Sequence, residues 1–263
     1  MYKLAVFDVD GTLVTRGQRV LLDSTIEALK TLKENGVYIA IASGRPLFAM
    51  EKSLLKHIDF DYFICSNGMC VADGKKQILF KQDMTKEEVE TLTKDFEKHD
   101  DALMFQFEDK AYIYHGRKRI SNMIHHCLGR LDILVDARKT RNRHATTLPY
   151  AAVSFIQKRH VAYYREAYSQ YSIIEFMEDY YDIFAKGCSK ASGIQHLCDN
   201  IHVEMKDVIC FGDALNDYEM IQACGCGVAM GDALDEIKEI ADYITEKSDD
   251  DGIYLACKHF HMI

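Results

Sequence analysis

Two short segments of the chain concentrate carboxylates in a pattern that could do chemistry on a phosphoryl group. One reads DVDGT and contains Asp8 and Asp10, and the other reads GDALND and contains Asp213 and Asp217. A carboxylate can act as a nucleophile, as a general acid or base, or as a ligand of a hard cation. An isolated aspartate after a strand is commonly a turn former or a helix cap, but the joint pattern favours a functional site.

A hydroxyl, a glycine and a lysine add groups that could bind phosphoryl oxygens. Ser43 and Gly44 lie in a segment that reads SGR, and Lys190 closes the segment GCSK before a predicted helix. Lys186, four residues upstream, is an alternative candidate for the phosphate-binding lysine. A lysine at the start of a helix is commonly solvated. The residues by themselves therefore leave the choice between the two lysines open.

Buried strands are predicted to bring these segments together. Continuous apolar runs predict strands at 4–7, 37–42, 62–65 and 208–211, separated by helical segments. The segment 24–27 (STIE) has the form of a capping box that opens a helix, and another helix is expected after Pro46. This alternation predicts a doubly wound α/β fold with a parallel sheet, in which ligands bind at the carboxyl ends of the strands.

The carboxylates themselves point to a divalent cation. Asp8 and Asp10 are two residues apart, so in an extended chain their side chains point the same way, and Gly11 allows a turn directly after them. Together with Asp213 they would repel one another unless a cation neutralised them. Mg²⁺ prefers oxygen ligands and bridges carboxylates to phosphate, so the sequence predicts a magnesium site.

A second domain is predicted inside the first. After about residue 81 the chain becomes more polar, with alternating strand patterns that suggest a smaller α+β domain. We therefore predict a core of 1–81 and 184–263, interrupted after its third strand by an inserted domain of 82–183.

The motifs resemble a known family. The segment 8–13 (DVDGTL) resembles the first motif of the haloacid dehalogenase-like (HAD) phosphatases, and Ser43, Lys190 and 212–217 resemble the second, third and fourth. The segment 227–233 (GVAMGDA) is similar to the tail of the Cof-type subfamily. The resemblance implies a Rossmann-like core with an inserted C2-type cap, the class IIB arrangement, in which the cap covers the carboxylates and selects the substrate.

The resemblance also implies a mechanism with an aspartyl-phosphate intermediate. Asp8 would attack phosphorus, and Asp10 would act as general acid and then as general base. Mg²⁺ would be held by Asp8, by the backbone carbonyl of Asp10 and by Asp213.

The remaining family residues would hold the phosphoryl group. Ser43, the backbone amide of Gly44 and Lys190 would bind its oxygens. Asp217 would orient Lys190 or a metal-bound water, and Asn216 would give nearby hydrogen-bonding support.

Composition restricts the partners. The formal charge of −9 disfavours a nucleic-acid partner, and no apolar run approaches the roughly 20 residues that cross a bilayer. No signal region precedes the first strand, so we expect a cytoplasmic protein with nine reduced cysteines. The expected substrates are small phosphorylated metabolites, either sugar phosphates or phosphorylated cofactors.

Two alternatives to a Mg²⁺-dependent phosphatase stay open. A sugar phosphomutase can share this core, and a non-catalytic phosphoacceptor module also places acidic residues, a hydroxyl and a lysine on a parallel sheet. Arg141, Arg143 and His144 form a basic cluster in the inserted domain that could grip a substrate, although a solvated face is the expected reading. The eleven histidines show no metal-ligand spacing, and His125 and His126 are expected on an exposed helix surface.

Overall fold

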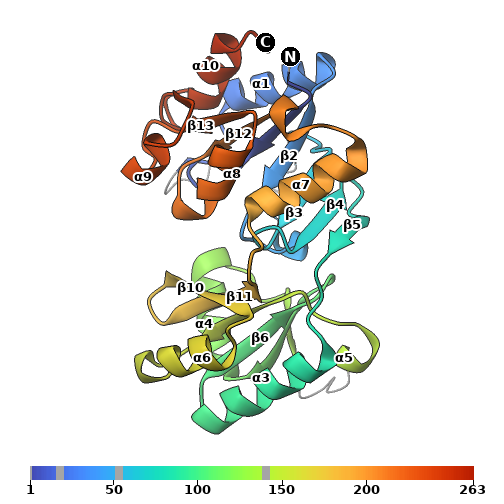
Figure 1. Cartoon of the computed structure of the whole chain (residues 1–263), viewed down its shortest axis with the longest axis vertical. Coiled ribbons are helices and arrows are strands. Elements are labelled where there is room, and N and C mark those ends of the chain that lie inside the picture. Colours follow the sequence, from blue (N-terminus) through green and yellow to red (C-terminus); the bar gives the residue numbers. More distant parts are fainter. Residues whose placement is uncertain (1, 16–20, 51–55, 138–142) are drawn as a thin grey trace. The chain divides into compact units, whose positions relative to one another are not determined.

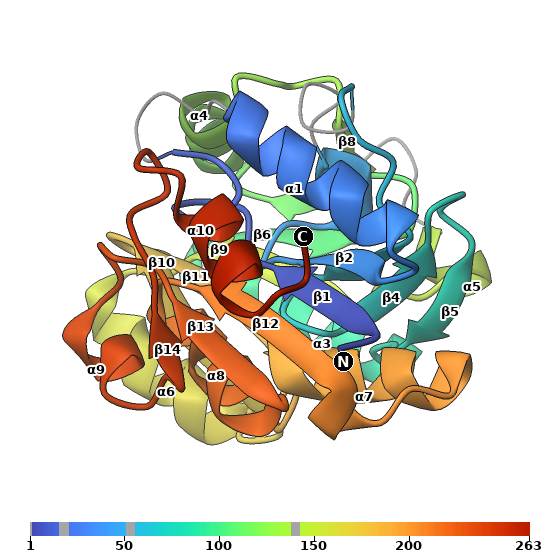
Figure 2. The same ribbon diagram turned by 90° about the horizontal axis from the view of Figure 1, so that it is seen from above.

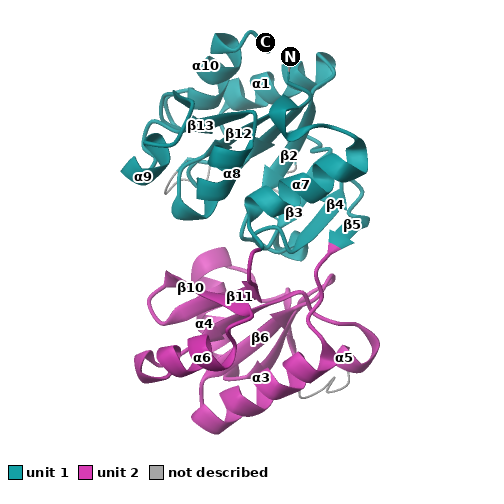
Figure 3. Cartoon of the chain, in the orientation of Figure 1, with its two compact units in different colours: residues 1–80, 188–263 teal, residues 81–187 magenta. Residues whose placement is uncertain are grey.

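The chain folds into two compact units. The structure is a computed structural model that describes residues 2–15, 21–50, 56–137 and 143–263. Unit 1 comprises Met1–Phe80 and Cys188–Ile263, and unit 2 comprises Lys81–Gly187 (Figure 3). The chain returns to unit 1 after Gly187 and not after residue 183 as predicted. The reason is that the strand Tyr180–Ala185 crosses the predicted boundary.

Unit 1 is built on an eight-stranded sheet (Figure 1). Its strands, in spatial order, are β14 (Tyr243–Ile244), β13 (Cys226–Ala229), β12 (Val208–Gly212), β1 (Leu4–Phe7), β2 (Tyr38–Ala42), β3 (Tyr62–Cys65), β4 (Cys70–Asp73) and β5 (Ile78–Lys81). Neighbours from β14 to β3 run parallel, and β4 is antiparallel to β3. Unit 2 is thus inserted after β5 and not directly after the third strand, because β4 and β5 extend the core sheet first.

Helices cover both faces of this sheet. The helices of unit 1 are α1 (Asp23–Glu34), α7 (Lys190–Ile201), α8 (Tyr218–Ala223), α9 (Asp235–Lys238) and α10 (Gly252–His259), with 3₁₀ turns at Leu47–Ala49, Met205–Asp207 and Leu215–Asp217. Figure 2 shows α1 and α10 on one face and α7 and α8 on the other. The sandwiched strand β1 is buried at all four residues, as its continuous apolar run predicts.

Two predicted helix starts differ in the structure. Helix α1 begins at Asp23, so Ser24 lies within its first turn, and its hydroxyl donates to Asp251 Oδ1 (2.5 Å) before α10. A tertiary contact between two helices has replaced the predicted capping box. After Pro46 the chain forms the 3₁₀ turn Leu47–Ala49, and residues 51–55 lie outside the described part of the chain.

Unit 2 is an α+β unit with a six-stranded sheet. Its strands, in spatial order, are β10 (Tyr171–Met177), β11 (Tyr180–Ala185), β9 (Ala151–Phe155), β6 (Ala102–Gln106), β7 (Ala111–His115) and β8 (Leu134–Asp136). Its helices are α3 (Lys86–His99), α4 (Arg117–Leu128), α5 (Arg143–Thr146) and α6 (Val161–Ala167), with a 3₁₀ turn at Lys158–His160. All neighbours pair antiparallel except β7 and β8.

The core of unit 2 is aromatic. Phe96 of α3 stacks on Tyr164 of α6 with ring centroids 4.4 Å apart, and both are fully buried beside Phe105 of β6. All nine cysteines of the chain are free thiols, and seven of them are buried. Within the described ranges, no helix has the length and apolar character needed to cross a membrane.

Candidate active site

Four charged side chains from distant parts of the sequence meet in the interior of unit 1. Asp8, Lys190, Asp213 and Asp217 each expose 6% of their surface or less. The Lys190 ammonium donates to Asp8 Oδ1 (2.5 Å) and to Asp217 Oδ1 (2.6 Å). The structure therefore brings together three carboxylates and one lysine that the sequence singled out.

Parallel strand pairing places the carboxylates of Asp8 and Asp213 side by side. Phe7, the last residue of β1, pairs with Phe211 of β12, and their rings stack with centroids 4.8 Å apart. The Asp8 amide continues the ladder by donating to the Phe211 carbonyl (3.0 Å). Asp213 follows β12 and accepts a hydrogen bond from the Thr12 hydroxyl (2.8 Å). Both carboxylates thus follow the carboxyl ends of adjacent strands, as the fold predicts.

Asp217 is held by the backbone as well as by Lys190. Its Oδ2 accepts hydrogen bonds from the amides of Asp213 (2.9 Å) and Ala214 (3.0 Å). The carboxylate therefore folds back over the turn after β12. One of its oxygens orders that turn, and the other receives the lysine.

Lys190 is buried because α7 packs closely on the loop after β3. Ser189 caps α7, so Lys190 is the first helical residue. Gly68 in that loop has φ +91°, and a Cβ atom there would lie 2.1 Å from the Ser189 carbonyl oxygen. Only glycine permits this approach, which carries the lysine into the interior and not to the solvated helix start that is usual. Lys186, the rival lysine, is exposed.

The site is short of positive charge. The pKa of the Asp8 carboxyl is raised to about 8, chiefly by burial and also by the neighbouring Asp217 and Asp213, against the opposing effect of Lys190. Burial lowers the pKa of Lys190, but the carboxylates of Asp217 and Asp8 outweigh this effect and hold it above its usual value. Three buried carboxylates with one ammonium leave a demand for a cation that a divalent ion meets.

The Asp10 side chain does not join this cluster, so the expectation that it points the same way as the Asp8 side chain was wrong, while its catalytic role stays a prediction. Asp10 is exposed and forms a two-pronged ion pair with Arg45, whose Nε and Nη2 lie 3.0 and 2.5 Å from its carboxylate oxygens. The rule that residues two apart point the same way holds only in a strand. Strand β1 ends at Phe7, and the chain then turns through Gly11 (φ 98°).

Three other predicted phosphate-binding residues, Ser43, Gly44 and Asn216, differ in their burial and in their neighbours. Ser43 is buried, and its Oγ accepts from the Arg45 amide (3.2 Å). A Cβ atom on Gly44 would lie 3.4 Å from the Asn67 carboxamide, so these two residues are neighbours. Asn216 lies in the 3₁₀ turn Leu215–Asp217 with an exposed side chain.

Three further polar residues were given no role by the sequence reasoning. The Thr12 hydroxyl holds Asp213, and the Arg45 guanidinium holds Asp10. Asn67 is almost fully buried, and its Oδ1 has no hydrogen-bond partner among the described residues. Thr12 and Arg45 belong to segments that carry predicted site residues, and Asn67 follows β3, so position after a strand was the available signal.

A metal could be held at the centre of the cluster. Asp8, Asp213 and Asp217 each offer a carboxylate oxygen, and these oxygens lie within 4.8 Å of one another. Oxygen donors of this kind suit a hard divalent cation. The structure groups the Asp217 carboxylate with those of Asp8 and Asp213, whereas the sequence analysis gave Asp217 a supporting role and named the backbone carbonyl of Asp10 as a ligand.

Comparison with known proteins agrees with this geometry. Residues 5–256 match the haloacid dehalogenase-like hydrolase family. The chain belongs to this family. It is 29% identical to YkrA of Bacillus subtilis, a protein provisionally named as a phosphatase, over 99% of this chain and 98% of the relative.

Two further relatives of this HAD-like hydrolase have named activities. The HMP-PP phosphatase of Yersinia enterocolitica is 29% identical over 91% of this chain and 87% of its own length. The sugar phosphatase BT4131, of HAD subclass IIB, is 28% identical with a TM-score of 0.83, covering 99% of this chain and 100% of that one. The chain is therefore a HAD-family phosphatase with an α/β core.

The basic cluster that the sequence suggested in unit 2 of this HAD-like phosphatase is engaged in internal contacts. Arg143 donates to Asp109 Oδ1 (3.0 Å), and His144 Nδ1 lies 2.9 Å from the Tyr114 hydroxyl. Arg141 lies outside the described residues. His125 and His126 are exposed on α4, as predicted.

Proposed function

We propose that the chain is a Mg²⁺-dependent phosphatase that hydrolyses small phosphorylated metabolites through an aspartyl-phosphate intermediate. The observation that carries this proposal is the buried contact of Asp8 with Lys190, beside Asp213 and Asp217, at the carboxyl ends of two parallel strands. A carboxylate held there is fixed for attack, and the ammonium beside it would bind a phosphoryl oxygen.

The reaction would proceed in two displacements at phosphorus. In the first, an Asp8 oxygen forms a bond to phosphorus while the bond to the leaving oxygen breaks, and Asp10 gives that oxygen a proton. In the second, Asp10 takes a proton from water, which attacks phosphorus and releases inorganic phosphate and the free Asp8 carboxylate. Ser43, the Gly44 amide and Lys190 would hold the phosphoryl oxygens in both steps.

Asp10 needs to leave Arg45 to take this role. In the structure the guanidinium donates to both carboxylate oxygens and so occupies the atoms that would carry the proton. A phosphorylated substrate offers Arg45 a competing anion. Substrate binding would thereby release the Asp10 carboxyl to act as the acid.

The buried charges fit a divalent cation. Asp8 and Asp213 would hold it, together with the backbone carbonyl of Asp10, while Asp217 stays on Lys190 and the backbone. Mg²⁺ bound there would neutralise negative charge on the phosphoryl oxygens. The carboxylate-only donor set favours Mg²⁺ over ions that prefer nitrogen or sulfur.

The substrate class rests on the relatives and on the inserted unit. One relative is named for HMP-PP and another for sugar phosphates, so sugar phosphates and phosphorylated cofactors are the proposed substrates. We assign unit 2 the role of the C2-type cap that selects among them. A cytoplasmic location belongs to the same proposal, because such metabolites are found there.

A panel of phosphorylated metabolites assayed for phosphate release tests the proposal. We expect multiple turnovers with Mg²⁺, loss of activity in chelator after removal of bound metal, and recovery when Mg²⁺ is restored. Release of no more than one phosphate per chain would favour a phosphoacceptor module. Isomerisation of a sugar phosphate that requires a bisphosphate activator would favour a phosphomutase.

A further inference from the structure

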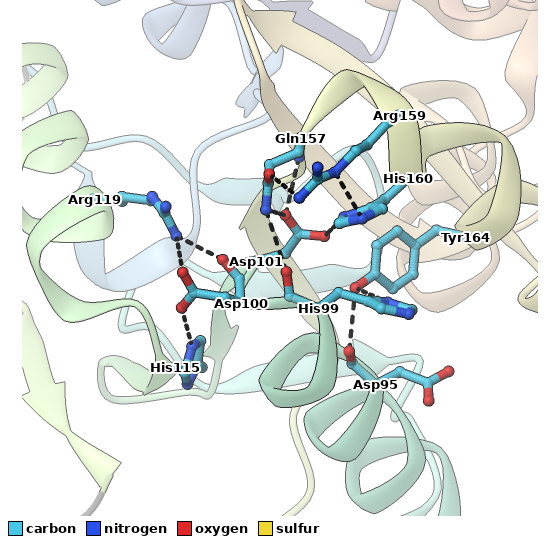
Figure 4. A network of polar contacts seen from close by, with 10 residues as sticks. All are labelled: Asp95, His99, Asp100, Asp101, His115, Arg119, Gln157, Arg159, His160 and Tyr164. Atoms are coloured by element: carbon cyan, nitrogen blue, oxygen red, sulfur yellow. Dashed lines mark hydrogen bonds and ion pairs between the residues drawn. The ribbon is translucent and has the colours of Figure 1, made fainter.

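A second cluster of ligating side chains lies in unit 2, outside the proposed catalytic machinery. His99 is the last residue of α3, Asp101 directly precedes β6, and His160 ends the 3₁₀ turn before α6. Figure 4 shows them within one polar network that also contains Gln157 and Tyr164. We propose that His99, Asp101 and His160 form a binding site for a divalent transition-metal ion of the Zn²⁺ type.

The donor atoms are close enough to share one ion. One ligand atom from each side chain lies within 4.8 Å of the other two, and the two imidazole rings lie side by side with centroids 4.8 Å apart. Ligands of tetrahedral Zn²⁺ bind at about 2.0–2.2 Å, so the ligand atoms stand roughly 3.3 Å from one another. To reach that spacing the partly exposed His99 moves inward, and the 2.6 Å contact between His160 Nδ1 and Asp101 Oδ2 lengthens.

The chemistry of this set differs from that of the carboxylate cluster in unit 1. Two imidazoles with one carboxylate favour Zn²⁺ and its neighbours in the first transition row, whereas Mg²⁺ prefers oxygen ligands. The two sites are therefore expected to take different ions from a mixture of both.

Asp101 supplies an electrostatic reason for a cation. Its carboxylate is fully buried, and within the described ranges its only ion-pair partner is His160, with Nδ1 2.6 Å from Asp101 Oδ2. A buried carboxylate requires compensating positive charge. A divalent ion bound between Asp101 and His160 would supply it.

The surroundings hold the ligands in place. Asp101 Oδ1 accepts from the Gln157 amide (3.0 Å) and from its carboxamide Nε2 (3.1 Å), which leaves Oδ2 as the oxygen directed at His160. The Tyr164 hydroxyl lies 3.2 Å from His99 Nδ1. Hydrogen bonds of this kind orient metal ligands and tune their basicity.

Metal binding also requires a rearrangement at His160. Arg159 Nε donates to His160 Nε2 (3.2 Å), so in this structure the His160 proton lies on Nδ1 and points to Asp101. An ion bound through Nδ1 and Asp101 Oδ2 takes the place of that proton, which shifts to Nε2 through solvent, so no net proton is released. The imidazole then carries its N–H on Nε2, and the Arg159 side chain turns away.

The test measures transition-metal binding in the full-length protein, with Co²⁺ as the probe and excess Mg²⁺ to fill the carboxylate cluster. We expect about one Co²⁺ per chain with the strong visible absorption of a four-coordinate ion, both in the wild type and in Asp8→Asn. His99→Gln and His160→Gln should weaken binding by ~100-fold or more. His125→Gln on the exposed face of α4 should leave binding unchanged.

A second measurement needs no variant of the site. Zn²⁺ added to the Mg²⁺-loaded wild type should shift the imidazole ¹⁵N resonances of His99 and His160 and leave those of His125 and His126 in place. The proposal is overturned if no transition ion is retained under excess Mg²⁺, if Asp8→Asn abolishes the binding, or if folded His99→Gln and His160→Gln bind as the wild type does. None of these outcomes depends on phosphatase activity.

Discussion

Both units contain carboxylates in their interior, but these are clustered in unit 1 and separate from one another in unit 2. In unit 1, Asp8, Asp213 and Asp217 are crowded together with Lys190 as the buried cation among them. In unit 2, carboxylates in the interior occur singly: Asp101 is fully buried, and Asp182 is half-buried. Asp101 receives hydrogen bonds from Gln157 and His160, whereas Asp182 forms no hydrogen bond or ion pair with any described residue.

We infer that the clustered carboxylates of unit 1 serve the reaction, whereas the single carboxylates of unit 2 contribute to the structure. Packing three carboxylates into one interior site opposes folding, so such a cluster is retained where a reaction needs it. A single carboxylate with several donors, such as Asp101, joins chain segments 56 to 59 residues apart in the sequence. Substitutions in the two units should therefore differ in whether they change activity, stability or both.

The largest effect is expected from Asp8→Asn. The amide has nearly the same shape but is a poor nucleophile, so kcat should fall on the order of 10⁴-fold or more, while the protein stays folded. Phosphate release in Mg²⁺ measures the loss, and circular dichroism checks the fold. Asp199→Asn, on the exposed part of α7, is the matched control and should keep full activity. A folded Asp8→Asn protein with near-normal turnover would refute the covalent mechanism.

Lys190→Met should change activity and stability together. Removal of the ammonium leaves Asp8 and Asp217 as unpaired buried charges, so the free energy of unfolding should fall by about 3–5 kcal/mol in metal-free buffer. Turnover should fall by roughly 10³-fold, since a donor to the phosphoryl group is lost as well.

The rival lysine is the control for that experiment. Lys186 lies four residues upstream and is exposed, so Lys186→Met should change neither urea unfolding nor turnover. If Lys186→Met lost activity and Lys190→Met kept it, the assignment of the phosphate-binding lysine would be reversed.

Asp10→Asn should have a smaller effect that depends on the leaving group. Asp10 lies outside the buried cluster, so its loss removes acid–base help worth about 10²–10⁴-fold and leaves the metal and the nucleophile in place. An alkyl phosphate needs the proton and should lose the full factor. A nitrophenyl phosphate has a good leaving group and should lose less in the first step. Equal losses with both substrates, in single-turnover measurements of phosphoryl transfer, would argue against the acid role.

Much of the catalytic unit could be predicted from the sequence because its signals are local. The apolar runs gave β1, β2, β3 and β12, and the polar residues that follow them converge because parallel strands share one carboxyl edge. Chemistry-bearing residue types at those positions were enough to select Asp8, Asp213 and Asp217.

Contacts between distant segments could not be predicted in this way. The burial of Lys190 depends on the approach of α7 to Gly68, and the placement of Asp10 depends on a turn that begins one residue after β1 ends. The pair of His99 and His160 has no recognisable spacing in the sequence, because the fold of unit 2 brings the two imidazoles together.

The smallest predicted effect tests the unpartnered carboxylate of unit 2. Asp182 lies on β11 between Ile174 of β10 and Val153 of β9, and burial alone raises its pKa from 3.8 to about 7. Between about pH 4 and pH 7 the folded protein holds a proton on Asp182 that the unfolded chain has lost. The free energy of unfolding therefore falls as the pH rises through this window.

Asp182→Asn removes the ionisation and keeps the size of the side chain. The variant should gain stability relative to the wild type as the pH rises, by about 1 kcal/mol between pH 5 and pH 8, since partial exposure reduces the effect of burial. Urea unfolding at the two pH values measures it, with the exposed Asp199→Asn as a control that should show no such trend. A pH-independent difference between Asp182→Asn and the wild type would mean that Asp182 is already charged at pH 5, and that its partial burial does not raise its pKa.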